Sequence, residues 1–391
     1  MMDVEKQKLN PNEVDLFADG FGAYCSKSVN ALLFQNWFNA LLLATIPAMM
    51  GVQLGWNDGV IFLFSLVAIA PFAERLSFVT EQLALHTSET LGGLLNATFG
   101  NVTELIVSLF ALRMGMLRIV QVSLLGSVLS NLLLVLGCAF FAGGVRCRLQ
   151  KFNKTAGTVS TGLLLLSTTA VVYPTFLGAV ETAAKALVVS RCISVLMLLT
   201  YGGYVYFQLV THTFLFDEEP AGGDDDDDDE EEEEPVLGVW GAIFWLAVIT
   251  VFISILSEYM VDALEGAAEN WGVPDLFLGT IIIPIVGNAA EHAAAIIFAV
   301  KNKMELALGI AVGSAIQISL FCVPALILTG WAFDANLSLD FKPFEAAAML
   351  LTIMIVGGTI SAGESTWLQG LMLVVAYCIV SAAYFVHEDV A

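Results

Sequence analysis

The chain has 391 residues, of which 58% are hydrophobic, and its mean hydropathy is +0.81. Its net charge of −23 is concentrated in one place, because removing the fourteen acids of 217–219 and 224–234 leaves only −9 over the remainder. The composition argues against a nucleic-acid-binding protein and, since polar and apolar residues do not alternate, against a transmembrane β-barrel; six cysteines with no CxxC spacing argue against a disulfide framework or a zinc site.

Apolar stretches long enough to cross about 30 Å of hydrocarbon as helices recur along the chain. Eleven spans are predicted, in chain order at 31–51, 59–86, 90–113, 118–144, 157–178, 188–214, 237–265, 275–300, 304–331, 343–362 and 367–386. The polar residues before them lack the short apolar core and cleavage site of a secretory signal. The sequence therefore predicts an all-α polytopic membrane protein with eleven transmembrane helices.

Two copies of one short motif lie within these spans. Residues 100–104 read Gly-Asn-Val-Thr-Glu and residues 287–291 read Gly-Asn-Ala-Ala-Glu, 187 positions later. Gly126-Ser127 and Gly313-Ser314 keep the same offset of 187. The offset relates spans two to six to spans seven to eleven, and an odd number of crossings in each unit predicts two inverted repeats, with the first span added outside them.

The predicted organisation has six parts. They are an N-terminal tail (1–30), an extra transmembrane helix (31–58), a first five-helix repeat (59–216), an acidic linker or helix (217–236), a second five-helix repeat (237–386) and a C-terminal tail (387–391). Loops on the side of the N-terminus carry nine Lys and Arg residues, against five on the other side. This bias predicts that the N-terminus and the acidic segment are cytosolic.

Glu104 and Glu291 place a carboxylate within stretches that must lie in lipid, where a charge is costly and therefore indicates a function. Each lies three positions after an asparagine, Asn101 or Asn288, so each pair shares a helix face. Glycine and proline precede both motifs, as at Pro284, and loosen the backbone so that carbonyls become free to bind a cation. The sequence predicts one cation site shared by two related halves.

Two carboxylates match the charge of a divalent ion, and amides, carbonyls and water supply the further oxygens that calcium takes. Calcium is favoured and Mn2+ stays open, while an all-oxygen set disfavours copper or zinc. The neighbouring helices add only neutral groups, which fits an exchanger driven by protons. No cofactor is expected beyond the transported ions. The predicted cation-binding residues are Glu104, Glu291, Asn101, Asn288, Gly100, Gly287, Ser127, Ser314 and Gln317.

Three further residues are candidates for proton coupling or ion access. His292 directly follows Glu291 and changes charge near physiological pH. Glu81 and Glu258 lie late in the first helix of each repeat. The acidic run at 224–234 has two interpretations: it is a solvated linker, or it is a regulatory Ca2+ sensor. Its candidate Ca2+ ligands are Asp224, Asp225, Asp226, Glu230, Glu231 and Glu234.

These residues resemble the cation/proton exchanger (CAX) family, in particular the vacuolar Ca2+/H+ exchangers of fungi and plants. The resemblance is carried by 92–104, 283–292 and 303–309, and extends roughly over 31–386. It implies a multi-pass antiporter in the membrane of the vacuole or another acidic organelle. The antiporter would move Ca2+ from the cytosol into the organelle as H+ moves back to the cytosol. It also implies that Glu104 and Glu291 hold Ca2+ and protons alternately.

Two other functions remain to be weighed. A Na+/Ca2+ exchanger of the same superfamily is disfavoured by the neutral layer of Ser130 and Gln317, since sodium sites gain from further charge. A Ca2+-permeable channel is disfavoured by inverted repeats with broken helices. An enzyme is not expected, because no nucleophile, base and oxyanion set stands out.

Overall fold

The computed structural model describes residues 21–34, 36–215 and 235–387, and nearly all of them are helical. The first part contains α1 (Phe21–Leu33), η1 (Trp37–Ala44), α2 (Thr45–Leu54), α3 (Asp58–Ala84), α4 (Glu89–Phe99), α5 (Val102–Arg113), α6 (Leu117–Leu129), η2 (Ser130–Val135), α7 (Leu136–Arg146), β1 (Gln150–Lys151), α8 (Lys154–Val180), α9 (Ala183–Tyr206), η3 (Phe207–Thr211) and η4 (Thr213–Leu215). The second contains α10 (Val239–Asp262), α11 (Leu264–Trp271), α12 (Asp275–Phe277), η5 (Leu278–Ile282), α13 (Ile283–Gly287), α14 (Ala289–Val300), α15 (Met304–Gln317), η6 (Ile318–Cys322), α16 (Val323–Ala332), α17 (Pro343–Ile360), β2 (Glu364–Ser365) and α18 (Trp367–Val386).

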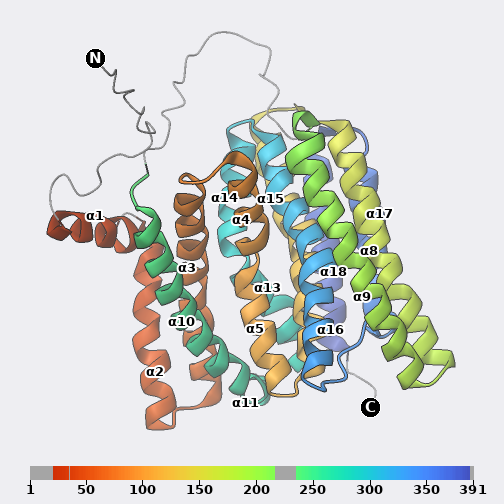
Figure 1. Ribbon diagram of the computed structural model, residues 1–391. Coiled ribbons are helices and arrows are strands. Elements are labelled where there is room, and N and C mark those ends of the chain that lie inside the picture. The colour runs from red at the N-terminus through yellow and green to blue at the C-terminus, as the bar shows by residue number, and fades with distance from the viewer. Residues whose placement is uncertain (1–20, 35, 216–234, 388–391) are drawn as a thin grey trace, which may run out of the picture.

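Most of these helices run alongside one another in one bundle, while α1 runs across their direction (Figure 1). In the part of the chain that the structure describes, nine helices are long and apolar enough to cross a membrane, or ten if the bent pair of α11 with α12–α13 is one span. All nine were predicted. The other two of the eleven predicted spans, 90–113 and 275–300, are each broken at the Gly-Asn motif into shorter helices.

Helix boundaries follow the internal repeat closely. α5 and α14 begin at Val102 and Ala289, and α6 and α15 begin at Leu117 and Met304, each pair 187 positions apart. Two π-helical segments, η2 and η6, begin at nearly equivalent positions, Ser130 and Ile318. π-helical turns within α-helices often mark functional sites. Here η2 begins at Ser130 of the predicted neutral layer, and η6 begins directly after Gln317 of that layer.

The two ends of the bundle are tied by different contacts. At one end, which we call the Lys301 end, β1 pairs with β2, and Gln150 Nε2 donates to the Ala299 carbonyl over 2.8 Å. The other, which we call the Arg118 end, holds an extended loop at 333–342. The loop's Leu339 N–H donates to Ser190 Oγ over 3.0 Å, and Arg118 pairs with the fully buried Glu345 just beyond it. The loop is thereby packed into the bundle at this end.

The helices α3 and α10 lie side by side and share a hydrophobic core of their own with α1 (Figure 1). Leu76 of α3 and Ile253 of α10 belong to it, as does Leu32 of α1. The main core instead centres on α6, η2, α15 and η6. The first helices of the two predicted repeats therefore have a small core of their own at one end, while other buried residues, such as Leu66 of α3 and Leu256 of α10, belong to the main core.

Close helix contacts depend on glycine where α7 crosses α18. A Cβ added at Gly144 would lie 2.2 Å from the Trp367 nitrogen, and one at Gly370 would lie 2.2 Å from the Phe141 nitrogen. Both distances are to backbone, which cannot rotate away. The two helices approach this closely only because these positions lack a side chain.

We expect Gly144→Ala to lower the free energy of unfolding by about 1–3 kcal/mol, because the added methyl group forces the α7 and α18 backbones apart. Thermal unfolding of the purified protein in detergent measures the change. The matched control is Gly162→Ala on α8, where a Cβ meets nothing within 4 Å. A Gly144→Ala protein as stable as this control would contradict the expectation.

Candidate functional site

Both motif helices are interrupted at the motif itself. α4 ends at Phe99 and α5 starts at Val102, while α13 ends at Gly287 and α14 starts at Ala289. Asn101 and Asn288 stand at the breaks in similar conformations, with φ and ψ of −115° and 30° and of −91° and 19°. A break leaves the last carbonyls of one helix and the first N–H groups of the next without helical partners. Free carbonyls of this kind are ligands for a cation.

The two motif carboxylates meet at these breaks. Glu104 and Glu291 lie in the first turns of α5 and α14, and both line one small internal cavity of about 10 Å3 together with Gly100 and Gly287. Within the described residues neither carboxylate is paired with a Lys or Arg. Two like charges this close in apolar surroundings repel each other, so the pair calls for a bound cation or for protons.

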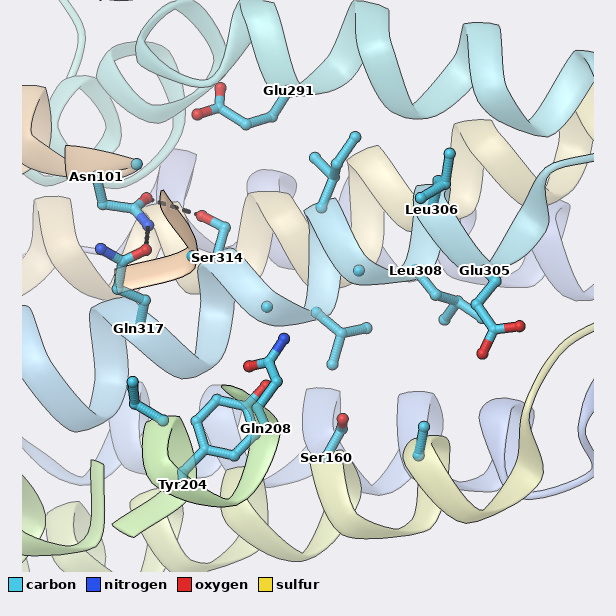
Figure 2. A pocket seen from close by; sticks show the side chains of 18 of the residues that line it. Asn101, Ser160, Tyr204, Gln208, Glu291, Glu305, Leu306, Leu308, Ser314 and Gln317 are labelled. Atoms are coloured by element: carbon cyan, nitrogen blue, oxygen red, sulfur yellow. Dashed lines mark hydrogen bonds between the residues drawn. The ribbon is translucent and has the colours of Figure 1, made fainter. Parts of the chain in front are cut away.

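Amide and hydroxyl side chains form a hydrogen-bonded chain beside Glu291. Asn131 Nδ2 donates to Ser314 Oγ over 2.9 Å, and Ser314 Oγ donates to Asn101 Oδ1 over 2.8 Å. Asn101 Nδ2 then donates to Gln317 Oε1 over 2.7 Å (Figure 2). The chain joins residues up to 216 positions apart, and it orients the motif asparagine of the first half.

The side chain of the second motif asparagine, Asn288, has weaker hydrogen bonding than that of Asn101. Asn288 is fully buried, and its Nδ2 reaches the Ser127 carbonyl only at 3.5 Å. Three buried oxygens around the breaks accept no hydrogen bond from the described residues: Asn288 Oδ1, Asn131 Oδ1 and Glu291 Oε2. Buried acceptors without donors are costly, and a cation is a group that satisfies several of them together. The donor set is all oxygen, which fits calcium.

A cavity of about 600 Å3 reaches this place from the Lys301 end. Its lining includes Glu305 in the first turn of α15 near the mouth, and Asn101, Ser314 and Gln317 at the far end (Figure 2). Glu291 lines both this cavity and the small one, whereas Glu104 lines only small internal cavities. Water and ions entering from the Lys301 end therefore meet Glu291 before Glu104.

The other predicted residues fall into different places. Glu81 lines the large cavity, but Glu258 is an exposed residue of α10 and does not line it. His292 is partly buried, and its Nδ1 lies 3.2 Å from the Asn288 carbonyl. Ser127 is buried against the second motif through its carbonyl. The six candidate ligands of the acidic run, Asp224 to Glu234, lie outside the described residues.

Several polar residues that line the large cavity were not among the predicted site residues. Glu305 lies near its mouth, and Tyr204, Gln208 and Ser160 form the wall opposite Ser314 (Figure 2). Gln208 projects from the π-helical segment η3. A lone glutamine or tyrosine late in an apolar span carries no pattern in the sequence, so only the packing of α8 and α9 across from α15 shows their position.

We expect Ser314→Ala to raise the Ca2+ concentration for half-maximal transport about tenfold, because it leaves the Asn131 amide and the Asn101 oxygen without their shared partner. Initial transport rates measured against Ca2+ concentration give this value. Ser160→Ala, on the opposite cavity wall, is the matched control and should change it less than about twofold. Equal effects of the two variants would mean that the hydrogen-bonded chain does not position the site.

Comparisons with known proteins find similarity along most of the chain. The sodium/calcium exchanger protein family matches residues 58–210 and 241–386. Vacuolar cation/proton exchanger 2 of Arabidopsis thaliana is 46% identical over 375 residues, which are 93% of this chain and 84% of that protein. Similarity at this level covers both motifs and nearly all the helices.

Two solved structures share the fold. The crystal structure of the Ca2+/H+ antiporter protein YfkE is 35% identical, with a TM-score of 0.75 over 90% of this chain and 99% of that one. The crystal structure of the H+/Ca2+ exchanger CAX has a TM-score of 0.67 over 92% of this chain and 93% of that one, but is only 14% identical and so supports the fold alone.

Proposed function

Because the chain belongs to the sodium/calcium exchanger protein family and, within it, to the vacuolar cation/proton exchangers, we propose that it is a Ca2+/H+ antiporter that loads an acidic vacuole with cytosolic Ca2+. It is a multi-pass membrane transporter and not an enzyme. One observation carries the proposal for its site: Glu104 and Glu291 share a small cavity at two equivalent helix breaks, with no Lys or Arg paired to either among the described residues.

The proposed exchange depends on competition at these two carboxylates. Calcium binds between Glu104 and Glu291, and Asn288 together with carbonyls freed at the breaks completes its shell. When two protons replace the ion, the carboxylates become neutral and the buried site again carries no net charge. Either occupant makes the site stable in apolar surroundings, whereas the empty charged pair is unfavourable. Movement of Ca2+ one way is thereby coupled to movement of protons the other way.

The proposed architecture has eleven spans, with each broken motif helix counted as one crossing. Five spans in 59–216 and five in 237–386 form inverted repeats, and 31–58 adds a helix outside them. The common offset of 187 between helix starts supports this arrangement. With the N-terminal tail and the segment 217–236 on the cytosolic side, the Lys301 end is cytosolic and the large cavity admits Ca2+ from the cytosol.

A Na+/Ca2+ exchanger is the alternative from the same family. Its sodium sites would gain from additional carboxylates around Glu104 and Glu291. Here the flanking layer is neutral, with Ser314 and Gln317 bonded to Asn101. This layer favours protons as the coupling ion, because protons need only the two carboxylates themselves.

Uptake of radiolabelled Ca2+ into sealed proteoliposomes tests the proposal. The full-length protein is reconstituted, and an acid-inside pH gradient is compared with an outward Na+ gradient of equal size. We expect uptake only with the pH gradient, and collapse of that gradient by a protonophore should stop it. Uptake that follows Na+, or downhill Ca2+ flux with neither gradient, would overturn the proposal. Competition by unlabelled Mn2+ in the same assay measures the preference between the two cations.

A further inference from the structure

Two glycines at equivalent positions of the repeat have opposite surroundings. A Cβ at Gly126 of α6 would lie 2.1 Å from the Thr280 carbonyl oxygen of η5, so these backbones are in tight contact. A Cβ at Gly313 of α15, 187 positions later, would meet nothing within 4 Å, and Gly313 lines the large cavity. The same position is therefore packed shut in one half and open in the other.

A second pair of positions repeats this difference one turn earlier. Val122 of α6 lies against Gly279 of η5, where a Cβ would be 3.0 Å from Val122 Cγ2. The position equivalent to Val122 is Gly309 of α15, which also lines the cavity and has nothing within 4 Å of a Cβ. The contact between α6 and η5 thus closes the Arg118 side of the site. No backbone makes the equivalent contact with α15 at Gly309 or Gly313.

The counterparts of Gly279 and Thr280 are Gly92 and Gly93 of α4. Gly93 lines the cavity, and its nearest neighbour at present is Leu209 of η3, 2.5 Å from an added Cβ. Glycine within a helix weakens it, so it is expected where another backbone must come close. Nothing lies within 4 Å of a Cβ added at Gly309 or Gly313, so both positions have room for another backbone to come close.

We propose that Gly309 and Gly313 form the surface on which α4 closes the cytosolic cavity. In the conformation open at the Arg118 end, Gly92 and Gly93 pack onto these two glycines as Gly279 and Thr280 now pack onto Val122 and Gly126. This rests on the proposed function, in which the repeats exchange conformations about a fixed site. Gly93 then leaves Leu209, and Glu291 is shut off from the cytosol.

The first test separates Ca2+ binding from Ca2+ transport. Gly313→Val fits the present conformation but blocks close approach of α4, so uptake driven by a pH gradient should fall at least about tenfold. Equilibrium binding of radiolabelled Ca2+ to the solubilised protein should stay within about twofold of the wild type, because the cytosol-open site is intact. The control is Gly162→Val on α8, where a Cβ also meets nothing within 4 Å but which does not line the cavity. This variant should keep both Ca2+ binding and Ca2+ uptake.

The second test detects the closed contact directly. Gly92→Cys and Gly309→Cys are combined in a chain whose native cysteines are replaced, and diamide accepts the two electrons and two protons as the thiols form a disulfide. Cross-linking is expected during turnover, with loss of uptake that a reductant restores. The pair Gly162→Cys with Gly309→Cys should not cross-link.

The outcomes separate this inference from the proposed function. If wild-type protein shows no uptake driven by pH, the proposed function fails. If wild type transports and Gly313→Val transports equally well, or if it loses Ca2+ binding together with transport, this closure surface is wrong. Absence of a disulfide between positions 92 and 309 during turnover would also overturn it.

Discussion

Glu104→Gln and Glu291→Gln should each reduce pH-driven Ca2+ uptake by about a hundredfold or more, since removing one partner from a desolvated charge contact costs about 3 kcal/mol or more. Glutamine keeps the size of the side chain and its oxygen acceptor, but it holds neither the negative charge nor the exchangeable proton. The two residues line one cavity, so either substitution leaves a single carboxylate for a divalent ion. Initial rates of uptake into proteoliposomes measure the effect.

A surface carboxylate provides the control. Glu181→Gln removes a charge of the same kind from an exposed pair with Lys185, 2.6 Å apart, and should leave uptake within about twofold of wild type. Because Glu104 and Glu291 act as a unit, the double variant should be no worse than either single one. Additive losses, or uptake that survives one substitution, would assign the ion to other ligands.

Arg118→Met should lower the free energy of unfolding by about 3 kcal/mol, because it strands the Glu345 carboxylate, which is fully buried, without its cationic partner. The estimate is taken at the low end because the Arg118 side chain is 22% exposed. Arg118 also donates to the Phe341 carbonyl over 3.1 Å, so the loss loosens the loop that packs into the Arg118 end. Thermal unfolding in detergent measures the loss.

The double variant Arg118→Met with Glu345→Met separates the stranded charge from the other contacts. Replacing both members by apolar side chains removes the uncompensated carboxylate, and stability should recover most of the way toward wild type. The bond to the Phe341 carbonyl is still lost, so recovery is expected to be incomplete. A double variant less stable than Arg118→Met alone would mean that the pair is not what stabilises this end.

The broken motif helices were predictable because their causes are local. Gly100 and Pro284 weaken helical hydrogen bonding within a few residues of the motif, and the structure breaks both helices there. The same local disruption explains the difference in spans, since two of the eleven predicted crossings do not form single long helices. The predicted ion ligands themselves remain a prediction, to which the shared cavity of Glu104 and Glu291 gives support.

The contacts around the site were less accessible to sequence reasoning. The sequence shows Asn131, Asn101 and Gln317 as polar positions in apolar helices. That Ser314 links Asn131 to Asn101, and that Asn101 donates to Gln317, depends on how separate helices pack together. Glu258 was predicted beside the ion path from its place late in a helix, and it does not line the cavity. Position along a helix does not fix which way the side chain faces in the assembled bundle.

The membrane-spanning character, the internal repeat and its two carboxylates can be read from the order of residues alone, because hydrophobic length and helix breaks are properties of neighbouring residues. Which side of the site is open depends instead on tertiary contacts. Gly126 and Gly313 stand in matching local sequence, and yet one touches the Thr280 backbone and the other faces a cavity. That difference comes from contacts between segments far apart in the chain, and the shared Gly-Ser pair at each position does not specify it locally.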